Sequence, residues 1–129
     1  MRRPTVFLAL AAGAVSAAGC GPRRAGPAEP PAVIIFRNQS LAEAAVYAVP
    51  RGGVQSRIGT VQSGRTDTLI LRGSAAGSGG AVAIVARMLA AQGAPTTGPL
   101  TLLAGDTVVV TLPPDGRTLT VLPTGGATP

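Results

Sequence analysis

The chain has 129 residues, a formal net charge of +6, no histidine, and a single cysteine, and its eleven basic residues are all arginine. A chain of this length holds at most one small domain, and one cysteine excludes an internal disulfide bond. Without histidine or lysine, the chain lacks the bases that usually activate a hydroxyl nucleophile and the nitrogen ligands that zinc prefers.

The first twenty residues have the order of a secretory leader. Arg2 and Arg3 precede an apolar run over residues 5–15, which is too short to span a hydrocarbon core of about 30 Å as a stable helix. Small residues follow at 16–19, directly before Cys20. We therefore expect residues 1–19 to be a signal peptide, with cleavage between Gly19 and Cys20.

The run Ala17-Ala18-Gly19-Cys20 resembles the lipobox of bacterial lipoproteins. The resemblance covers only the leader, and it departs from the commonest pattern at Ala17, where leucine is usual. It implies that Cys20 is linked to diacylglycerol, becomes the new N-terminus and carries a further acyl chain such as palmitate. An uncleaved anchor and a plain secretory leader with an incidental thiol remain the alternatives. The lipoprotein interpretation is favoured because Cys20 is the sole cysteine.

The same resemblance implies a location in the cell envelope. Two or more acyl chains hold a protein firmly on a membrane, whereas one gives only reversible attachment. In a cell with two membranes, Gly21 stands where an inner-membrane retention signal would have aspartate, so we expect the periplasmic face of the outer membrane. In a cell with one membrane, we expect the outer face of the plasma membrane.

Cleavage leaves 110 residues with a net charge of +4. Residues 20–31 contain the lipidated cysteine, four prolines and two glycines, a composition that favours extended, solvated backbone. We expect this segment to be a tether, residues 32–123 to be a β-sandwich domain, and residues 124–129 to be a flexible tail.

The domain contains short runs rich in β-branched residues, separated by turn residues. One run is ambiguous: the alanine, leucine and methionine of 81–91 suit a helix, while Val82 to Val85 after a glycine suit a buried strand. We favour a strand there, because its neighbours are strands at regular spacing. The other predicted strands are 32–37, 43–49, 54–61, 66–72, 100–104, 107–112 and 117–122.

Seven to eight short strands predict an all-β fold, a small antiparallel β-sandwich of immunoglobulin-like or transthyretin-like kind. Pro113-Pro114-Asp115-Gly116 predicts a tight hairpin turn between the last two strands. The cysteine and tryptophan of a true immunoglobulin core are missing. The triplet Asn38-Gln39-Ser40 matches a glycosylation sequon, which we interpret as a chance match in a bacterial lipoprotein.

Four carboxylates in the domain were considered for catalysis: Glu43, Asp67, Asp106 and Asp115. The last two lie at predicted turns, where aspartate commonly accepts a hydrogen bond from its own backbone. Glu43 and Asp67 are a candidate acid–base pair, but nothing in their spacing brings them together. We therefore expect no enzyme activity, no metal and no cofactor.

The arginines are dispersed along the chain, and Phe36 and Tyr47 are the only aromatic residues after the leader. Nucleic-acid binding favours a concentrated basic face with aromatic side chains for stacking, so we expect no nucleic-acid partner. We expect a membrane contact through the lipid anchor and a protein partner in the envelope. The function that fits is a non-catalytic structural or protein-interaction module. The alternative is an accessory lipoprotein that binds a small molecule or a glycan.

Overall fold

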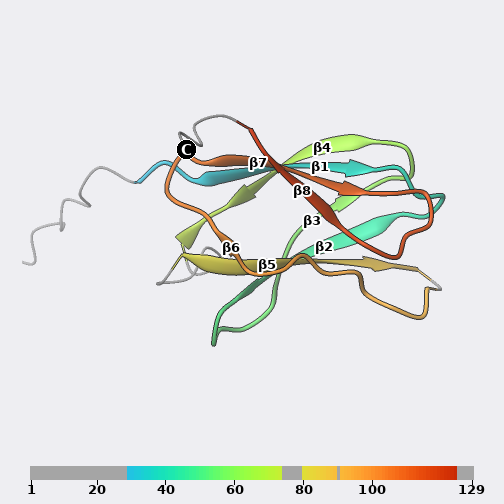
Figure 1. The fold of residues 1–129 in the computed structure, drawn as a ribbon, viewed down its shortest axis with the longest axis horizontal. Coiled ribbons are helices and arrows are strands. Elements are labelled where there is room, and N and C mark those ends of the chain that lie inside the picture. The colour runs from blue at the N-terminus through green and yellow to red at the C-terminus, as the bar shows by residue number, and fades with distance from the viewer. Residues whose placement is uncertain (1–28, 74–79, 90, 125–129) are drawn as a thin grey trace, which may run out of the picture.

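The computed structural model describes residues 29–73, 80–89 and 91–124. The predicted signal peptide, the cleavage site at Gly19 and Cys20, and most of the tether lie outside these residues. The described part is all-β, without an α-helix, which settles the fold class as the sequence predicted it (Figure 1). It accordingly contains no helix long and apolar enough to cross a membrane.

Eight strands form two four-stranded sheets, which Figure 1 shows as two stacked layers. Sheet A has the order β4-β1-β7-β8, and sheet B has the order β3-β2-β5-β6. The strands are β1 (Ala32–Asn38), β2 (Ala44–Pro50), β3 (Ser56–Val61), β4 (Thr66–Leu71), β5 (Ala81–Met88), β6 (Leu100–Thr101), β7 (Thr107–Leu112) and β8 (Thr120–Pro123).

Each strand places successive side chains on opposite faces of its sheet, so that each sheet turns one apolar face toward a shared core. In β1, Ile34 and Phe36 are fully buried, while Val33 and Ile35 alternate with them on the opposite face and are only partly buried. The buried cluster runs from Ala32 to Leu112, and Leu119 and Val121 pack against it. A chain that begins after Cys20 therefore keeps every strand and the whole described core.

One strand pairing is parallel. β1 lies beside β7 with Val33 opposite Thr107 and Asn38 opposite Leu112, while the other five pairings are antiparallel. The first two strands also lie in different sheets, whereas they share a sheet in the immunoglobulin order. The strand order therefore differs from the immunoglobulin order, and the fold is a small β-sandwich of eight strands.

The ambiguous segment is a strand, as favoured from the sequence, and β5 ends at Met88. The edge of β5 that does not face β2 is hydrogen-bonded by residues 95–97, which follow it in the chain. Thr97 donates its N–H to the carbonyl of Ile84 (2.9 Å), and its hydroxyl accepts the N–H of Ile84 (2.9 Å). The N–H of Ala86 donates to the carbonyl of Pro95 (3.0 Å). Because both sides of β5 are paired, the extended conformation is the one that satisfies its backbone.

The strands β3, β5, β6 and β8 are each at least two residues shorter than predicted. For β6 and β8 the cause is an aspartate that closes the neighbouring turn. The carboxylate of Asp106 accepts the N–H of Leu103 (2.8 Å), so β6 stops at Thr101 and does not reach residue 104. The carboxylate of Asp115 accepts the N–H of Arg117 (3.1 Å), which delays the start of β8 from residue 117 to Thr120. Both aspartates thus bond their own turns, as expected.

The strand directions give the sandwich two distinct ends. We call the end where β1 begins the proximal end; there, residues 51–55 join β2 to β3 and residues 102–106 join β6 to β7. We call the opposite end the distal end; residues 39–43, 62–65, 91–95 and 113–117 lie there. A tether that precedes β1 therefore reaches the domain at its proximal end.

Candidate functional site

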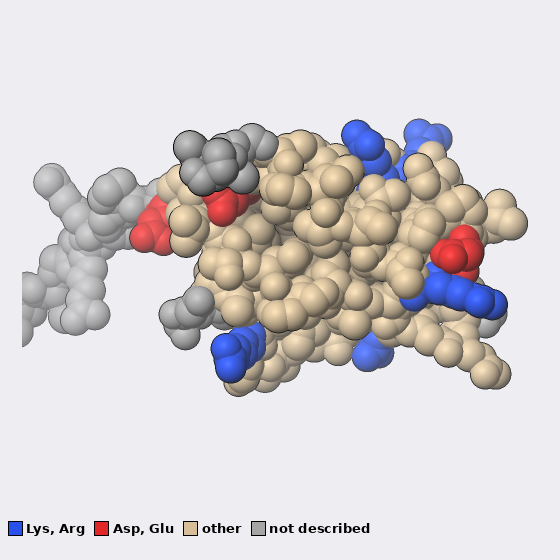
Figure 2. All heavy atoms as spheres, in the orientation of Figure 1, with Lys and Arg blue, Asp and Glu red and all other residues tan. Residues whose placement is uncertain are grey.

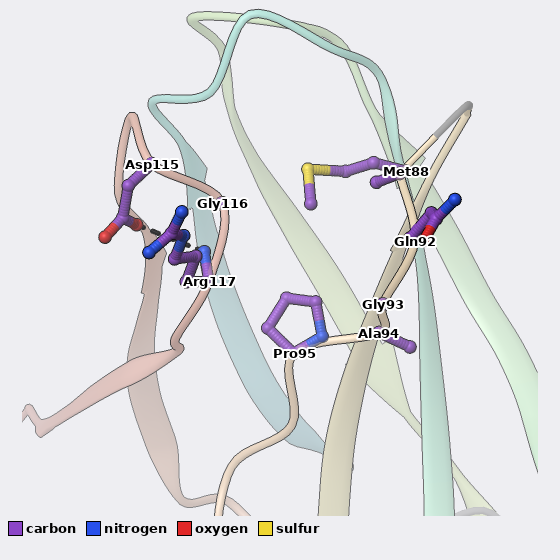
Figure 3. Close-up of a pocket in the computed structure, with 9 residues that line it drawn as sticks. Met88, Gln92, Gly93, Ala94, Pro95, Asp115, Gly116 and Arg117 are labelled. Atoms are coloured by element: carbon purple, nitrogen blue, oxygen red, sulfur yellow. Dashed lines mark hydrogen bonds between the residues drawn. The ribbon is translucent and has the colours of Figure 1, made fainter.

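The distal end contains a cleft of about 530 Å³ between the end of β5 and the β7–β8 turn (Figure 3). Met88 and Pro95 contribute one wall, and Asp115, Gly116 and Arg117 contribute the other. The cleft thus combines an apolar wall with one acidic and one basic side chain.

The sequence shapes this cleft through the predicted hairpin turn. The N–H of Gly116 donates to the carbonyl of Pro113 (3.0 Å), and Gly116 has a φ of +62°, a conformation that favours glycine. A Cβ at this position would lie 2.9 Å from Cε of Met88. Met88 therefore packs directly against the turn. Because Gly116 has no Cβ, the side chain of Met88 has room there.

The two carboxylates of the candidate acid–base pair have different surroundings, one in a loop and one on a strand. Glu43 immediately precedes β2 and accepts a hydrogen bond from the side chain of Gln62. Asp67 lies on β4, in register with Phe36 of β1. Both are exposed. Among the residues that the structure describes, no three histidine, cysteine, aspartate or glutamate side chains cluster to form a metal site.

The outer side of sheet B carries a second candidate site, centred on Tyr47. Tyr47 lies opposite Arg57 on β3 and opposite Val85 on β5. The guanidinium carbon of Arg87 lies 5.3 Å from the centroid of the Tyr47 ring, within the range of a cation–π interaction. We call Tyr47, Arg57 and Arg87 the basic face.

Neutral partners hold both arginines of the basic face. Arg87 donates to the side-chain oxygen of Gln55 (3.3 Å), and Arg57 donates to the hydroxyl of Thr60. The strands β2, β3 and β5 contain no aspartate or glutamate. In Figure 2, acidic atoms lie toward the two ends of the molecule, and the lower edge, on the side of sheet B, shows basic atoms and no acidic ones. The positive charge of this face is therefore not offset within its own strands.

A groove of about 500 Å³ continues the basic face toward the proximal end. Arg51 lines it together with apolar residues, among them Val49, Ala83 and Pro99. The basic face was not predicted from the sequence, because Arg57 and Arg87 are separated by 30 positions. The period-2 alternation of 43–49 and 81–88 was the signal that could have placed Tyr47 and Arg87 on the same side.

The sequon residue Asn38 has a structural role. It is 1% exposed, and its amide nitrogen donates to the carbonyls of Ala42 (2.7 Å) and Val61 (3.0 Å). Its side-chain oxygen accepts the N–H and the hydroxyl of Ser40. A nitrogen engaged in this way inside the domain is not presented for glycosylation.

Comparison with known proteins adds little to this geometry. No protein-family model matches the chain, and no curated protein matches it. Among solved structures, the chain is similar to an NMR structure of a protein from Eubacterium rectale, with 15% identity and a TM-score of 0.46. That match covers 86% of this chain and 100% of the other. The description of the fold rests on the strands and their registers.

Proposed function

We propose that this protein is a lipid-anchored lipoprotein of the cell envelope that acts as a non-catalytic structural or protein-interaction module. The observation that carries the proposal is the position of the sole cysteine. Cys20 directly follows Ala17-Ala18-Gly19 at the end of a leader, and the first strand of a self-contained domain begins only twelve residues later.

The architecture supports a displayed domain. Twelve residues of proline-rich chain span at most about 37 Å in the extended polyproline conformation. They join the sandwich at its proximal end, so the four distal segments lie farthest from an anchor at Cys20. A protein partner in the envelope would meet the distal segments, whereas the lipid would hold the proximal end.

Metabolic labelling with an alkyne-bearing fatty acid tests the anchor in a bacterial host that processes lipoproteins. We expect the full chain to be labelled and its mature form to begin at Cys20. Cys20→Ser should lose the label and accumulate as precursor, because a hydroxyl does not form the thioether. Cys20→Ser combined with Thr66→Cys is the matched control, since it restores one thiol at an exposed position without restoring the lipid. A labelled Cys20→Ser chain would contradict the proposal.

The distal cleft supports a second candidate function, the binding of a small polar molecule. Its volume of about 530 Å³ lies in the range of ligand sites. Asp115 and Arg117 on one wall would suit a ligand that carries both an ammonium and a carboxylate group. A thermal-shift titration with free amino acids and dipeptides tests this, and Arg117→Gln should weaken any stabilisation that arises in the cleft.

A further inference from the structure

We propose that the outer side of sheet B is a docking face for an anionic phospholipid surface. This docking surface comprises the basic face together with Arg51 and Val54 of the β2–β3 loop and the groove beside them. The inference rests on the proposed lipid anchor for its cellular setting, but its chemistry is a property of the folded domain.

Charge is the first argument. Arg51, Arg57 and Arg87 lie on or beside three adjacent strands that carry no carboxylate. Guanidinium groups bind phosphate through paired N–H donors, and each basic side chain near an anionic bilayer strengthens binding about five-fold. Arg87 is already oriented by Tyr47 and Gln55, so less conformational freedom is lost when it binds.

Apolar exposure beside the arginines distinguishes lipid from an acidic protein surface. Val54 is 87% exposed at the proximal end, a few positions from Arg51. The groove beside Arg51 is lined by Val49, Ala83 and Pro99. A purely acidic partner would leave Val54 in water, whereas the boundary between headgroups and acyl chains accepts an apolar tip with arginines around it.

The position of the docking surface also fits a bilayer. Arg51 and Val54 lie at the proximal end, which is the end that a tether from Cys20 would hold nearest to the membrane. A tether that spans at most about 37 Å keeps the domain at a high effective concentration near that surface, so weak individual contacts are enough for docking.

Vesicle co-sedimentation tests the proposal on a chain of residues 21–129, which lacks the lipid anchor and keeps all eight strands. We expect this chain to sediment with vesicles of phosphatidylcholine and phosphatidylglycerol, and to stay in solution with phosphatidylcholine alone. Arg57→Gln with Arg87→Gln should lower the partition coefficient about twenty-five-fold, since two contributions of about five-fold are lost. Added salt should weaken binding, because it screens exposed charges.

The matched control removes the same charge from the distal end. Arg37→Gln with Arg65→Gln should leave most of the vesicle binding intact, because both residues lie toward the distal end and outside sheet B. An equal loss in the two double variants would overturn the proposal, since it would show attraction by net charge alone. All four positions are exposed, and an unchanged melting temperature would show that each variant is folded.

Tryptophan fluorescence tests the orientation independently. The chain has no tryptophan, so Val54→Trp introduces a single reporter, and we expect its emission to shift to the blue on vesicles that contain phosphatidylglycerol. Leu41→Trp is the control at the distal end, where the native side chain is 95% exposed, and its emission should not shift. A shift at position 41 and not at position 54 would overturn the proposal.

The vesicle assay is separate from the assay for lipidation. The chain of residues 21–129 has no Cys20, so its binding does not depend on acylation, and fatty-acid labelling of the full chain does not depend on the docking surface. Failure to sediment with either type of vesicle would refute lipid docking, and an acidic protein would then be the partner to seek for the basic face.

Discussion

Asn38 is one of three buried polar residues in the described part of the chain, and its hydrogen bonds stabilise the distal end. Its side chain bonds the β1–β2 loop through Ser40 and Ala42 and the end of β3 through Val61. The hydroxyl of Ser63 donates to the carbonyl of Ser40 (2.7 Å) and links the β3–β4 turn to the same group. Each of these atoms is buried or part-buried, so each needs the partner that Asn38 or Ser40 supplies.

Replacing Asn38 with alanine should therefore cost about 3 kcal/mol of unfolding free energy, because carbonyl and hydroxyl groups would be left buried without partners. Urea denaturation measures the loss. Gln39→Ala is the control, since Gln39 is exposed beside it, and it should change the stability by less than about 0.5 kcal/mol. An equally small effect at Asn38 would contradict the role assigned to its hydrogen bonds.

Val109 and Val110 are adjacent in β7 but belong to opposite faces of sheet A. Val110 is fully buried in the core, whereas Val109 is 5% exposed and lies opposite Ile35 and Leu122 on the outer face. Val110→Thr should cost about 2 kcal/mol, because its hydroxyl enters a core of apolar side chains. Val109→Thr should cost less than half as much, since Leu122 beside it is largely exposed and water is near. Urea denaturation measures both losses of stability. A larger loss for Val109→Thr than for Val110→Thr would contradict the assignment of Val110 to the core face of β7.

At the scale of the element, the turn of the β7–β8 hairpin requires glycine at position 116 for two reasons, its backbone conformation and its close contact with Met88. Gly116 has a positive φ and also faces Met88, whereas Gly64 in the β3–β4 turn has a φ of +69° and open space around it. Comparing substitutions at Gly64 and Gly116 therefore separates the free-energy cost of a positive φ from the free-energy cost of a close side-chain contact.

Gly64→Ala should cost about 1 kcal/mol, because alanine is strained at positive φ. Gly116→Ala should cost more, since its Cβ would also displace Met88. In a Met88→Ala background the two glycine substitutions should cost the same, which a double-mutant cycle with thermal or urea denaturation would measure. If Gly116→Ala still cost more than Gly64→Ala in that background, the contact with Met88 would not be the cause of the extra cost.

At the scale of the whole molecule, the parallel pairing of β1 with β7 joins segments more than seventy residues apart. Closing so long a loop is entropically unfavourable before its contacts form, and sandwiches dominated by such pairings fold in milliseconds to seconds. We expect stopped-flow refolding of residues 21–129 to give rates in that range. Complete folding within microseconds would contradict a transition state that needs the β1–β7 pairing.

Much of this fold was predictable from local sequence alone. The β-branched runs 32–37 and 107–112, and the turn from Pro113 to Gly116, place strands and a hairpin where the structure has them, because β-branched side chains pack well on a pleated sheet and Pro and Gly favour a tight turn. The lipobox at Cys20 is also local, and it remains a prediction. Residues 81–91 were ambiguous, because a short apolar run suits a buried helix as well as a buried strand.

The tertiary structure alone decided which strands are neighbours and which side chains gather. The parallel β1–β7 pair, the position of Thr97 beside Ile84, and the approach of Arg57 and Arg87 to Tyr47 each join residues distant in sequence. No local pattern encodes such pairings, because they depend on how two sheets satisfy their backbone groups and bury their apolar faces together. The candidate sites are made of these non-local contacts. The sequence by itself therefore determined the strands and the expected location in the cell envelope. The packing of the two sheets determined the distal cleft and the basic face.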